Sequence, residues 1–210
     1  QTIVFPEDFI FQTSRFSDGN ILTLGLGRLS LIDIHKLQTT TFRNSKKPVL
    51  NLKDIQLIHE LGQDKCYLLQ PNGTTYFYDY LLDSLTHMGN FLITHFPKVS
   101  ISKMVIEQSG TIWFASNFGL IKMDKDSCLS SYILESKGSH NTIHGFQKID
   151  NTIWMANNHK LGKLDLETGK VQFLTEADGF YQKQLNGQSL IQLNNGMLYI
   201  GCKDGLYEIQ

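Results

Sequence analysis

The histidines His140 and His144 lie four residues apart, a spacing that could bind a metal ion. On a helix this spacing would place both imidazoles on one face, as in many zinc sites. Here the pair lies in "SHNTIHGF", a turn-rich stretch between strand-like runs, and no acidic residue completes a site. We therefore expect these histidines to lie in a loop and to bind no metal.

Two other patterns suggest chemistry at first inspection. The stretch "GLGRLS" (25–30) contains the Gly-x-Gly of a phosphate-binding loop, but it lacks the third glycine and the helix whose N-terminus would hold the phosphate. Four aspartates, Asp33, Asp79, Asp124 and Asp165, could form an acidic site, but they recur at one position of a repeat. We expect them to accept bonds from backbone N–H groups in turns. The sequence thus predicts no catalytic residue, no metal and no cofactor.

The repeat consists of five segments of equal length that align without a gap. Each opens on a turn residue, often followed by a glycine suited to positive φ, and continues as an apolar strand, a loop and a second strand. Each segment is therefore predicted to be a β-hairpin. The hairpins span residues 18–33, 64–79, 109–124, 150–165 and 195–210.

The spacers between the hairpins hold further strand-like runs, such as "DIQLIHEL" (54–61), "GKVQFLT" (169–175) and "QSLIQL" (188–193). Four strands per repeat, at a period of about 41 to 46 residues, is typical of a β-propeller blade. We predict an all-β chain, a single domain over 1–210, with about five four-stranded antiparallel blades. The large residues Trp113, Trp154 and Tyr199 are expected to pack between blades.

Two of these repeats resemble the two-component regulator propeller repeat. The stretch "MVIEQSGTIWFASNFGLIKMD" (104–124) carries its acid, glycine, tryptophan, Gly-Leu and final aspartate; the matching residues are Glu107, Gly110, Ile112, Trp113, Gly119, Leu120 and Asp124. The copy at 150–165 keeps Trp154 and Asp165 but has Lys160-Leu161 in place of Gly-Leu. The tail, 177–210, resembles the final blade of these propellers.

The resemblance implies a periplasmic sensor domain of a hybrid two-component system in Bacteroides-type bacteria. Such a domain is the extracytoplasmic part of an inner-membrane protein whose histidine kinase region is not in this chain. It implies an oligosaccharide ligand, control of polysaccharide-utilisation genes, and a possible homodimer through the parent sensor. Two alternatives stay open: an enzyme of the propeller lyase or hydrolase type, and a protein-interaction scaffold.

The number of blades leaves two hypotheses open. Five repeats could close as a small ring, with Thr2–Phe5 supplying the outermost strand of the fifth blade. Alternatively, the chain is a fragment of a larger, seven-bladed propeller. We favour the fragment, because the chain does not begin with Met and stops at the end of a hairpin.

Composition limits the partners. The net charge of −1 lacks the basic excess of a nucleic-acid-binding protein. No apolar run approaches the roughly 18 residues of a membrane span, so we expect no membrane contact by this segment. Three cysteines without paired spacing predict neither a disulfide framework nor a zinc site.

A ligand site is expected where propeller loops gather around the central channel. These are the loops between the second and third strands of each blade and the loops leading into each first strand. Their amides, charges and aromatic faces suit a sugar, which needs both hydrogen bonds and an apolar contact. The candidate ligand-binding residues are Arg28, Asn117, Phe118, Asn158, His159, Lys203, Asp204, His140 and Tyr181.

Overall fold

The computed structural model forms two compact units, residues 1–100 and 101–210. It describes residues 10–25, 28–41, 55–90, 92, 95–124, 126, 129–132, 141–181, 184–194 and 196–209. Thr2–Phe5 and His140, which the sequence analysis singled out, lie outside these residues. A single domain over 1–210 stays a prediction, and each unit is described by itself below.

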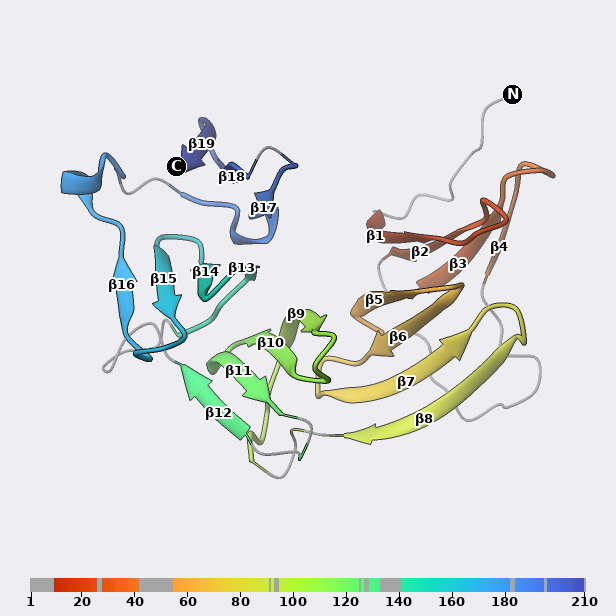
Figure 1. Ribbon diagram of the computed structural model, residues 1–210. Coiled ribbons are helices and arrows are strands. Elements are labelled where there is room, and N and C mark those ends of the chain that lie inside the picture. The colour runs from red at the N-terminus through yellow and green to blue at the C-terminus, as the bar shows by residue number, and fades with distance from the viewer. Residues whose placement is uncertain are drawn as a thin grey trace. The chain divides into compact units, whose positions relative to one another are not determined.

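The first unit holds two four-stranded antiparallel sheets (Figure 1). Blade 1 is β1 (Ile10–Arg15), β2 (Ile21–Gly25), β3 (Arg28–Asp33) and β4 (Gln38–Thr41), paired in chain order. Blade 2 is β5 (Leu57–Gly62), β6 (Lys65–Leu69), β7 (Thr74–Asp79) and β8 (Ser84–Asn90), also in chain order. Both are simple meanders, in which every strand pairs with its neighbours in sequence.

The second unit holds three more sheets of the same topology. Blade 3 is β9 (Ile101–Ile106), β10 (Ile112–Ser116), β11 (Gly119–Met123) and β12 (Leu129–Tyr132). Blade 4 is β13 (Gly145–Ile149), β14 (Thr152–Ala156), β15 (Leu161–Asp165) and β16 (Val171–Phe173). Blade 5 has three described strands, β17 (Ile191–Gln192), β18 (Leu198–Cys202) and β19 (Gly205–Ile209).

All five predicted hairpins are present as antiparallel strand pairs. The pairs are β2 with β3, β6 with β7, β10 with β11, β14 with β15, and β18 with β19. The turns that open three of them place Gly19, Gly110 and Gly196 at φ values of 88°, 86° and 85°. Glycine adopts these values without the steric cost of a Cβ, as the sequence pattern predicted.

The aspartates that close four hairpins have the turn role predicted for them. In Asp33 and Asp165, Oδ1 accepts bonds from the N–H groups two and three residues ahead, at 2.8–3.0 Å. Asp79 accepts one from Leu82 N–H, and Asp124 one from Asp126 N–H. The prediction that these residues cap turns is confirmed.

Neighbouring sheets bury apolar side chains between them. In the first unit, Phe16 and Leu22 of blade 1 pack in one cluster with Leu68 of blade 2. Buried Cys66 belongs to the same cluster, and burial raises the pKa of its thiol to about 12. A sheet with one face against a neighbour stabilises both, which explains why the repeats stack.

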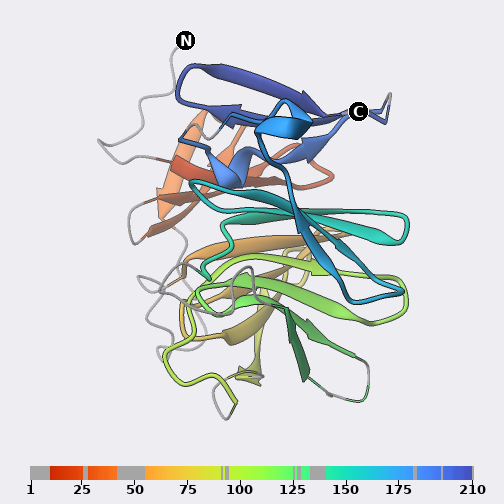
Figure 2. The same cartoon turned by 90° about the vertical axis from the view of Figure 1, so that its left-hand side faces the viewer.

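The second unit has two such interfaces, and Figure 2 shows the β13–β16 sheet lying over the β9–β12 sheet. Trp113 is 2% exposed and packs with Phe146 and Met155 between blades 3 and 4, as predicted. A second cluster joins blade 4 to blade 5. Trp154 is half-buried and packs against this second cluster, whereas Tyr199 is half-buried outside it.

Side chains of the first strand of one blade bond the backbone of the neighbouring blade, in its first strand or just before it. The amide of Gln12 in β1 bonds both the N–H and the C=O of Ile58 in β5. In the second unit, Ser102 Oγ donates to Ile143 O at 2.6 Å and Lys103 Nζ donates to Phe146 O at 2.7 Å. First strands held side by side are the arrangement of propeller blades, so the predicted fold class is confirmed.

Helical structure in the described residues is limited to two 3₁₀ turns, η2 (Glu176–Asp178) and η3 (Gly187–Ser189). Neither approaches the length needed to cross a membrane, and the described part of the chain holds no other helix.

Candidate functional site

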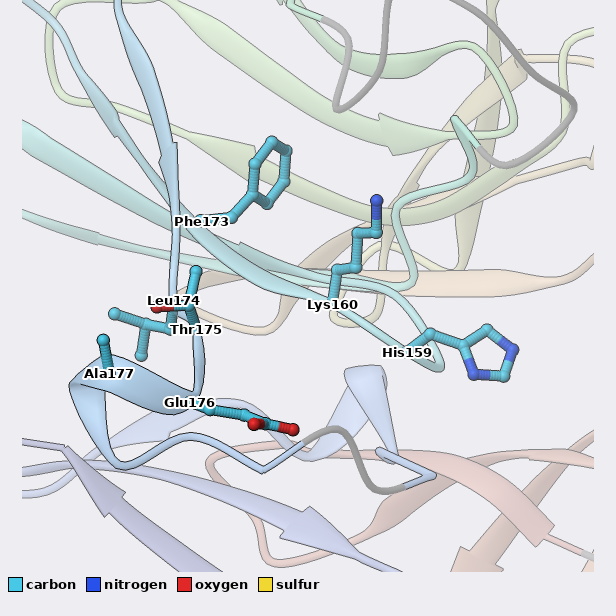
Figure 3. Close-up of a pocket in the computed structure, with 7 residues that line it drawn as sticks. All are labelled: His159, Lys160, Phe173, Leu174, Thr175, Glu176 and Ala177. Atoms are coloured by element: carbon cyan, nitrogen blue, oxygen red, sulfur yellow. The ribbon is translucent and has the colours of Figure 1, made fainter.

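An open groove of about 550 Å³ lies on blade 4 (Figure 3). One wall comes from the loop between β14 and β15, and the other from the end of β16 and from η2. The lining residues are His159, Lys160, Phe173, Leu174, Thr175, Glu176 and Ala177. The groove lies wholly within the second unit and has the size of an ordinary small-ligand site.

The first wall is shaped by a buried asparagine. Asn157 is 6% exposed, and its Oδ1 accepts bonds from the N–H groups of His159 and Lys160 at 2.8 and 2.7 Å. The Asn157 N–H donates to Lys160 O at 3.0 Å. Three bonds within four residues hold the loop in one conformation, so both side chains leave the backbone in defined directions.

Lys160 occupies a loop position that varies between the blades. The aligned residue is Arg28 in blade 1, Thr74 in blade 2, and glycine in blades 3 and 5, where Gly119 and Gly205 have φ values of 104° and 152° that side chains other than glycine rarely adopt. Lys160 does not have a positive φ, because the bonds to Asn157 reshape the loop. Blade 4 therefore presents a long cationic side chain where blades 3 and 5 have glycine, and blade 1 has Arg28 at the same position.

The aromatic part of the groove depends on a departure from the repeat at Gly162. Gly162 pairs with Phe173 across β15 and β16, and a Cβ at Gly162 would lie 3.1–3.2 Å from two atoms of the Phe173 ring. The aligned residues in the other blades are Ser30, Tyr76, Ile121 and Tyr207. A side chain at this position would crowd the Phe173 ring. Lys160 Nζ lies over the ring, 5.4 Å from its centroid, a favourable cation–π distance.

The second wall is held by a local hydrogen-bond network. Asp178 Oδ2 accepts bonds from the N–H and the hydroxyl of Thr175, both at 2.9 Å. These bonds lower the pKa of Asp178, and the bond from the Thr175 backbone N–H makes the larger contribution. Gly179 ends η2 in the left-handed region at φ 75°, with its N–H donating to Glu176 O. The network fixes the turn that carries Glu176 along the edge of the groove.

The groove thus combines several kinds of recognition group. Figure 3 shows Lys160 and Phe173 extending to the same side, Glu176 on η2 facing the β14–β15 loop, and His159 extending from that loop next to Lys160. An ammonium and an imidazole lie on one wall, a carboxylate lies on the other, and an aromatic ring lies beside them. Such a set can bind hydroxyl and ionised groups of a ligand, and can contact an apolar face.

The sequence-predicted site residues fall into separate places, and of those that the structure describes only His159 lines the groove. Asn158 and Lys203 both contact the segment before η3, since Leu185 N–H donates to Asn158 O and Lys203 N–H donates to Gln184 O. Tyr181 is 60% exposed, and its carbonyl accepts the hydroxyl of Tyr207 at 2.9 Å. Asp204 is exposed in the turn before β19.

The other candidates lie away from the groove. Asn117 and Phe118 form the turn between β10 and β11, where Phe118 N–H donates to Ser116 Oγ at 3.1 Å. Arg28 begins β3 in the first unit. A ligand-binding role for these residues stays a prediction.

Sequence reasoning missed Lys160, Phe173 and Glu176. The replacement of Gly-Leu by Lys160-Leu161 was a visible signal, since it breaks the repeat at a loop position. Phe173 and Glu176 gave no signal of their own, because their place in the groove depends on the pairing of β16 with β15. Among the described residues, no three His, Cys, Asp or Glu side chains gather as metal ligands would.

Comparison with known proteins establishes the fold. No family model matches the sequence, and no curated protein matches it. Among solved structures, the chain is similar to the extracellular domain of a hybrid two-component system from B. thetaiotaomicron, with a TM-score of 0.72 and 14% identity over 98% of this chain and 28% of that one.

Two further structures have other roles. PorZ, a surface component of the type-IX secretion system of Porphyromonas gingivalis, gives a TM-score of 0.65 at 14% identity, over 96% of this chain and 32% of that one. The WD40 β-propeller domain of Doa1 gives a TM-score of 0.63 at 14% identity, over 99% of this chain and 65% of that one. The chain spans about a third or less of the first four structures. At these identities the likeness shows a shared β-propeller fold.

Proposed function

We propose that this chain is the ligand-sensing propeller region of an extracytoplasmic two-component sensor, and that it binds an oligosaccharide in the groove on blade 4 without chemical turnover. The observation that carries the proposal is the construction of the groove. Gly162 departs from the larger residues aligned with it in the other four blades, and the Phe173 ring that it accommodates lines one concave site together with Lys160. Residues that break a structural pattern are expected at functional sites.

The fold and the resemblance support the sensor assignment. Several structures similar to this chain are extracellular domains of B. thetaiotaomicron signalling systems. The repeat at 104–124 carries the two-component regulator pattern on which the resemblance rests. A parent sensor would place the propeller outside the inner membrane, with its kinase region inside and a homodimer as the signalling unit.

The chemistry of the groove supports a sugar ligand. Sugar hydroxyls can donate to Glu176, and the C–H face of a pyranose ring can contact Phe173 and Leu174. Signalling then needs only differential affinity: a ligand that binds one arrangement of the parent sensor better than another shifts the population toward it.

A glycan panel tests the proposal. The chain is mixed with plant and host glycan oligomers, and its melting temperature is measured by differential scanning fluorimetry. A ligand that binds only the native state raises the melting temperature by mass action. We expect at least one glycan to raise it without being cleaved, as checked by chromatography of the glycan. Cleavage, or no shift with any member of the panel, would refute the proposal.

A further inference from the structure

The wall formed by the β14–β15 loop has a distinct charge. His159 and Lys160 are adjacent in this loop, and both line the groove. The bonds from Asn157 fix their backbone, and the Phe173 ring holds the Lys160 ammonium at 5.4 Å. The cationic group is therefore prearranged at the groove, which reduces the entropy lost when a ligand binds.

The loop position of Lys160 also points to charge. The repeat does not require one residue type here, since the aligned residues are Arg28, Thr74, Gly119 and Gly205. In blade 4 the loop is capped by Asn157, and the residue at this position is a lysine whose ammonium lies over the Phe173 ring that lines the groove. What Lys160 adds to the site is an ammonium group.

From these observations we infer that the groove selects an acidic oligosaccharide, one whose sugars carry a carboxylate or a sulfate group. This inference rests on the proposed function. The anionic group binds at the His159–Lys160 wall. The carboxylate of Glu176 on the opposite wall repels an anion and accepts hydroxyl bonds. The two walls therefore orient the sugar in one direction across the groove.

The test uses matched pairs of probes that differ only in charge. Tetragalacturonate is compared with its fully methyl-esterified form, and a sulfated carrageenan tetrasaccharide with its desulfated form, by isothermal titration calorimetry on the whole chain. We expect the charged member of at least one pair to bind about tenfold or more tightly, and its affinity to fall as NaCl is raised. The pair that shows the difference identifies carboxylate or sulfate as the group recognised.

Two variants locate the effect. Lys160→Gln removes the ammonium and is expected to weaken binding of the acidic probe about tenfold. Lys170→Gln is the matched control, because Lys170 is an exposed lysine of the same blade that does not line the groove. It is expected to leave the Kd unchanged. The melting temperatures of both variants show that they are folded.

The outcomes separate this inference from the proposed function. Equal binding of charged and neutral probes, or an unchanged Kd in Lys160→Gln, overturns the acidic-sugar inference and leaves oligosaccharide sensing standing. If neither these probes nor any member of the glycan panel binds, the proposed function fails, and the inference fails with it.

Discussion

Glu107 joins blade 3 to blade 4, and replacing it tests how the sheets are held together. Its Oε1 accepts a bond from Trp113 Nε1 at 2.7 Å and one from Lys148 Nζ at 2.6 Å. The side chain is 21% exposed, and Trp113 is 2% exposed. Burial alone would raise the pKa of Glu107, but the bonds from Lys148 and Trp113 outweigh it and lower that pKa.

The magnitude follows from what each substitution leaves behind. Glu107→Ala removes a charge-assisted bond to Lys148 and leaves the buried Trp113 N–H without its acceptor, at a cost of about 2 kcal/mol. For a chain of this size that corresponds to a fall in melting temperature of about 4 to 8 °C. Glu107→Gln keeps an acceptor oxygen but loses the charge, and we expect about half the effect.

The assay is thermal unfolding followed by circular dichroism, with Lys36→Met as the control. Lys36 pairs with Asp33 at 3.0 Å, but its side chain is 72% exposed, so its loss should cost at most about 0.5 kcal/mol. A Lys148→Met variant and the double variant Glu107→Ala/Lys148→Met give the coupling energy between these two residues, which we expect to be about 1 kcal/mol. The reasoning is wrong if Glu107→Ala is no more destabilising than Lys36→Met.

Three further predictions concern packing, the groove and acid. Gly145→Ala places a Cβ 2.2 Å from the carbonyl oxygen of Gly187, so we expect the free energy of unfolding, measured by urea denaturation, to fall by about 3 kcal/mol. A fall of less than about 1 kcal/mol would contradict the packing of blade 4 on η3. Asn157→Ala removes the acceptor of two loop N–H groups, so we expect it to lower the free energy of unfolding by about 1 to 2 kcal/mol and to weaken the binding of any groove ligand. An unchanged Kd would show that ligand binding does not need the hydrogen bonds from Asn157. Hydrogen bonds from turn N–H groups, above all from the residue three positions ahead, lower the folded-state pKa of Asp33 and Asp165 below the ordinary value of 3.8. The stabilisation from these bonds is therefore present above pH 3.8 and is lost as the pH falls through the folded-state pKa values. The melting temperature should drop in that pH range, and a constant melting temperature would refute the turn role.

Much of the blade structure could be predicted from sequence because it is local. In the hairpin at 109–124, the turn residues, the apolar run and the final aspartate all lie within one short segment. Its strands pair in simple register, from Ile112 with Met123 to Ser116 with Gly119. Local propensity and turn chemistry agree there with the tertiary fold, so the pattern alone was sufficient.

The outer and linking segments were less predictable. The run at 188–193 reads as one strand, but Gly187–Ser189 forms a 3₁₀ turn and only Ile191 and Gln192 are paired as a strand. A Cβ at Gly187 would lie 2.9–3.0 Å from His144 and from the carbonyl oxygen of Ala156. Contact with blade 4 therefore shapes this segment, and no local pattern encodes that contact.

The groove could be predicted only in part, for the same reason. His159 was identified because it lies in a hairpin loop, and such loops follow directly from the repeat. Phe173 and Glu176 reach the groove through the pairing of Gly162 with Phe173 and through the bonds between Thr175 and Asp178. The first of these depends on strand register, which a single sequence does not specify at the end of a blade.

Hydrogen exchange on the ligand-bound chain tests the central claim, that a departure from the blade repeat builds the binding site. The chain is saturated with the tightest glycan found, and amide protection is measured by mass spectrometry. We predict increased protection in 157–160 and 173–178, and none in the equivalent hairpin loops at 116–119 and 202–205. Protection confined to those other loops, with blade 4 unchanged, would contradict the account.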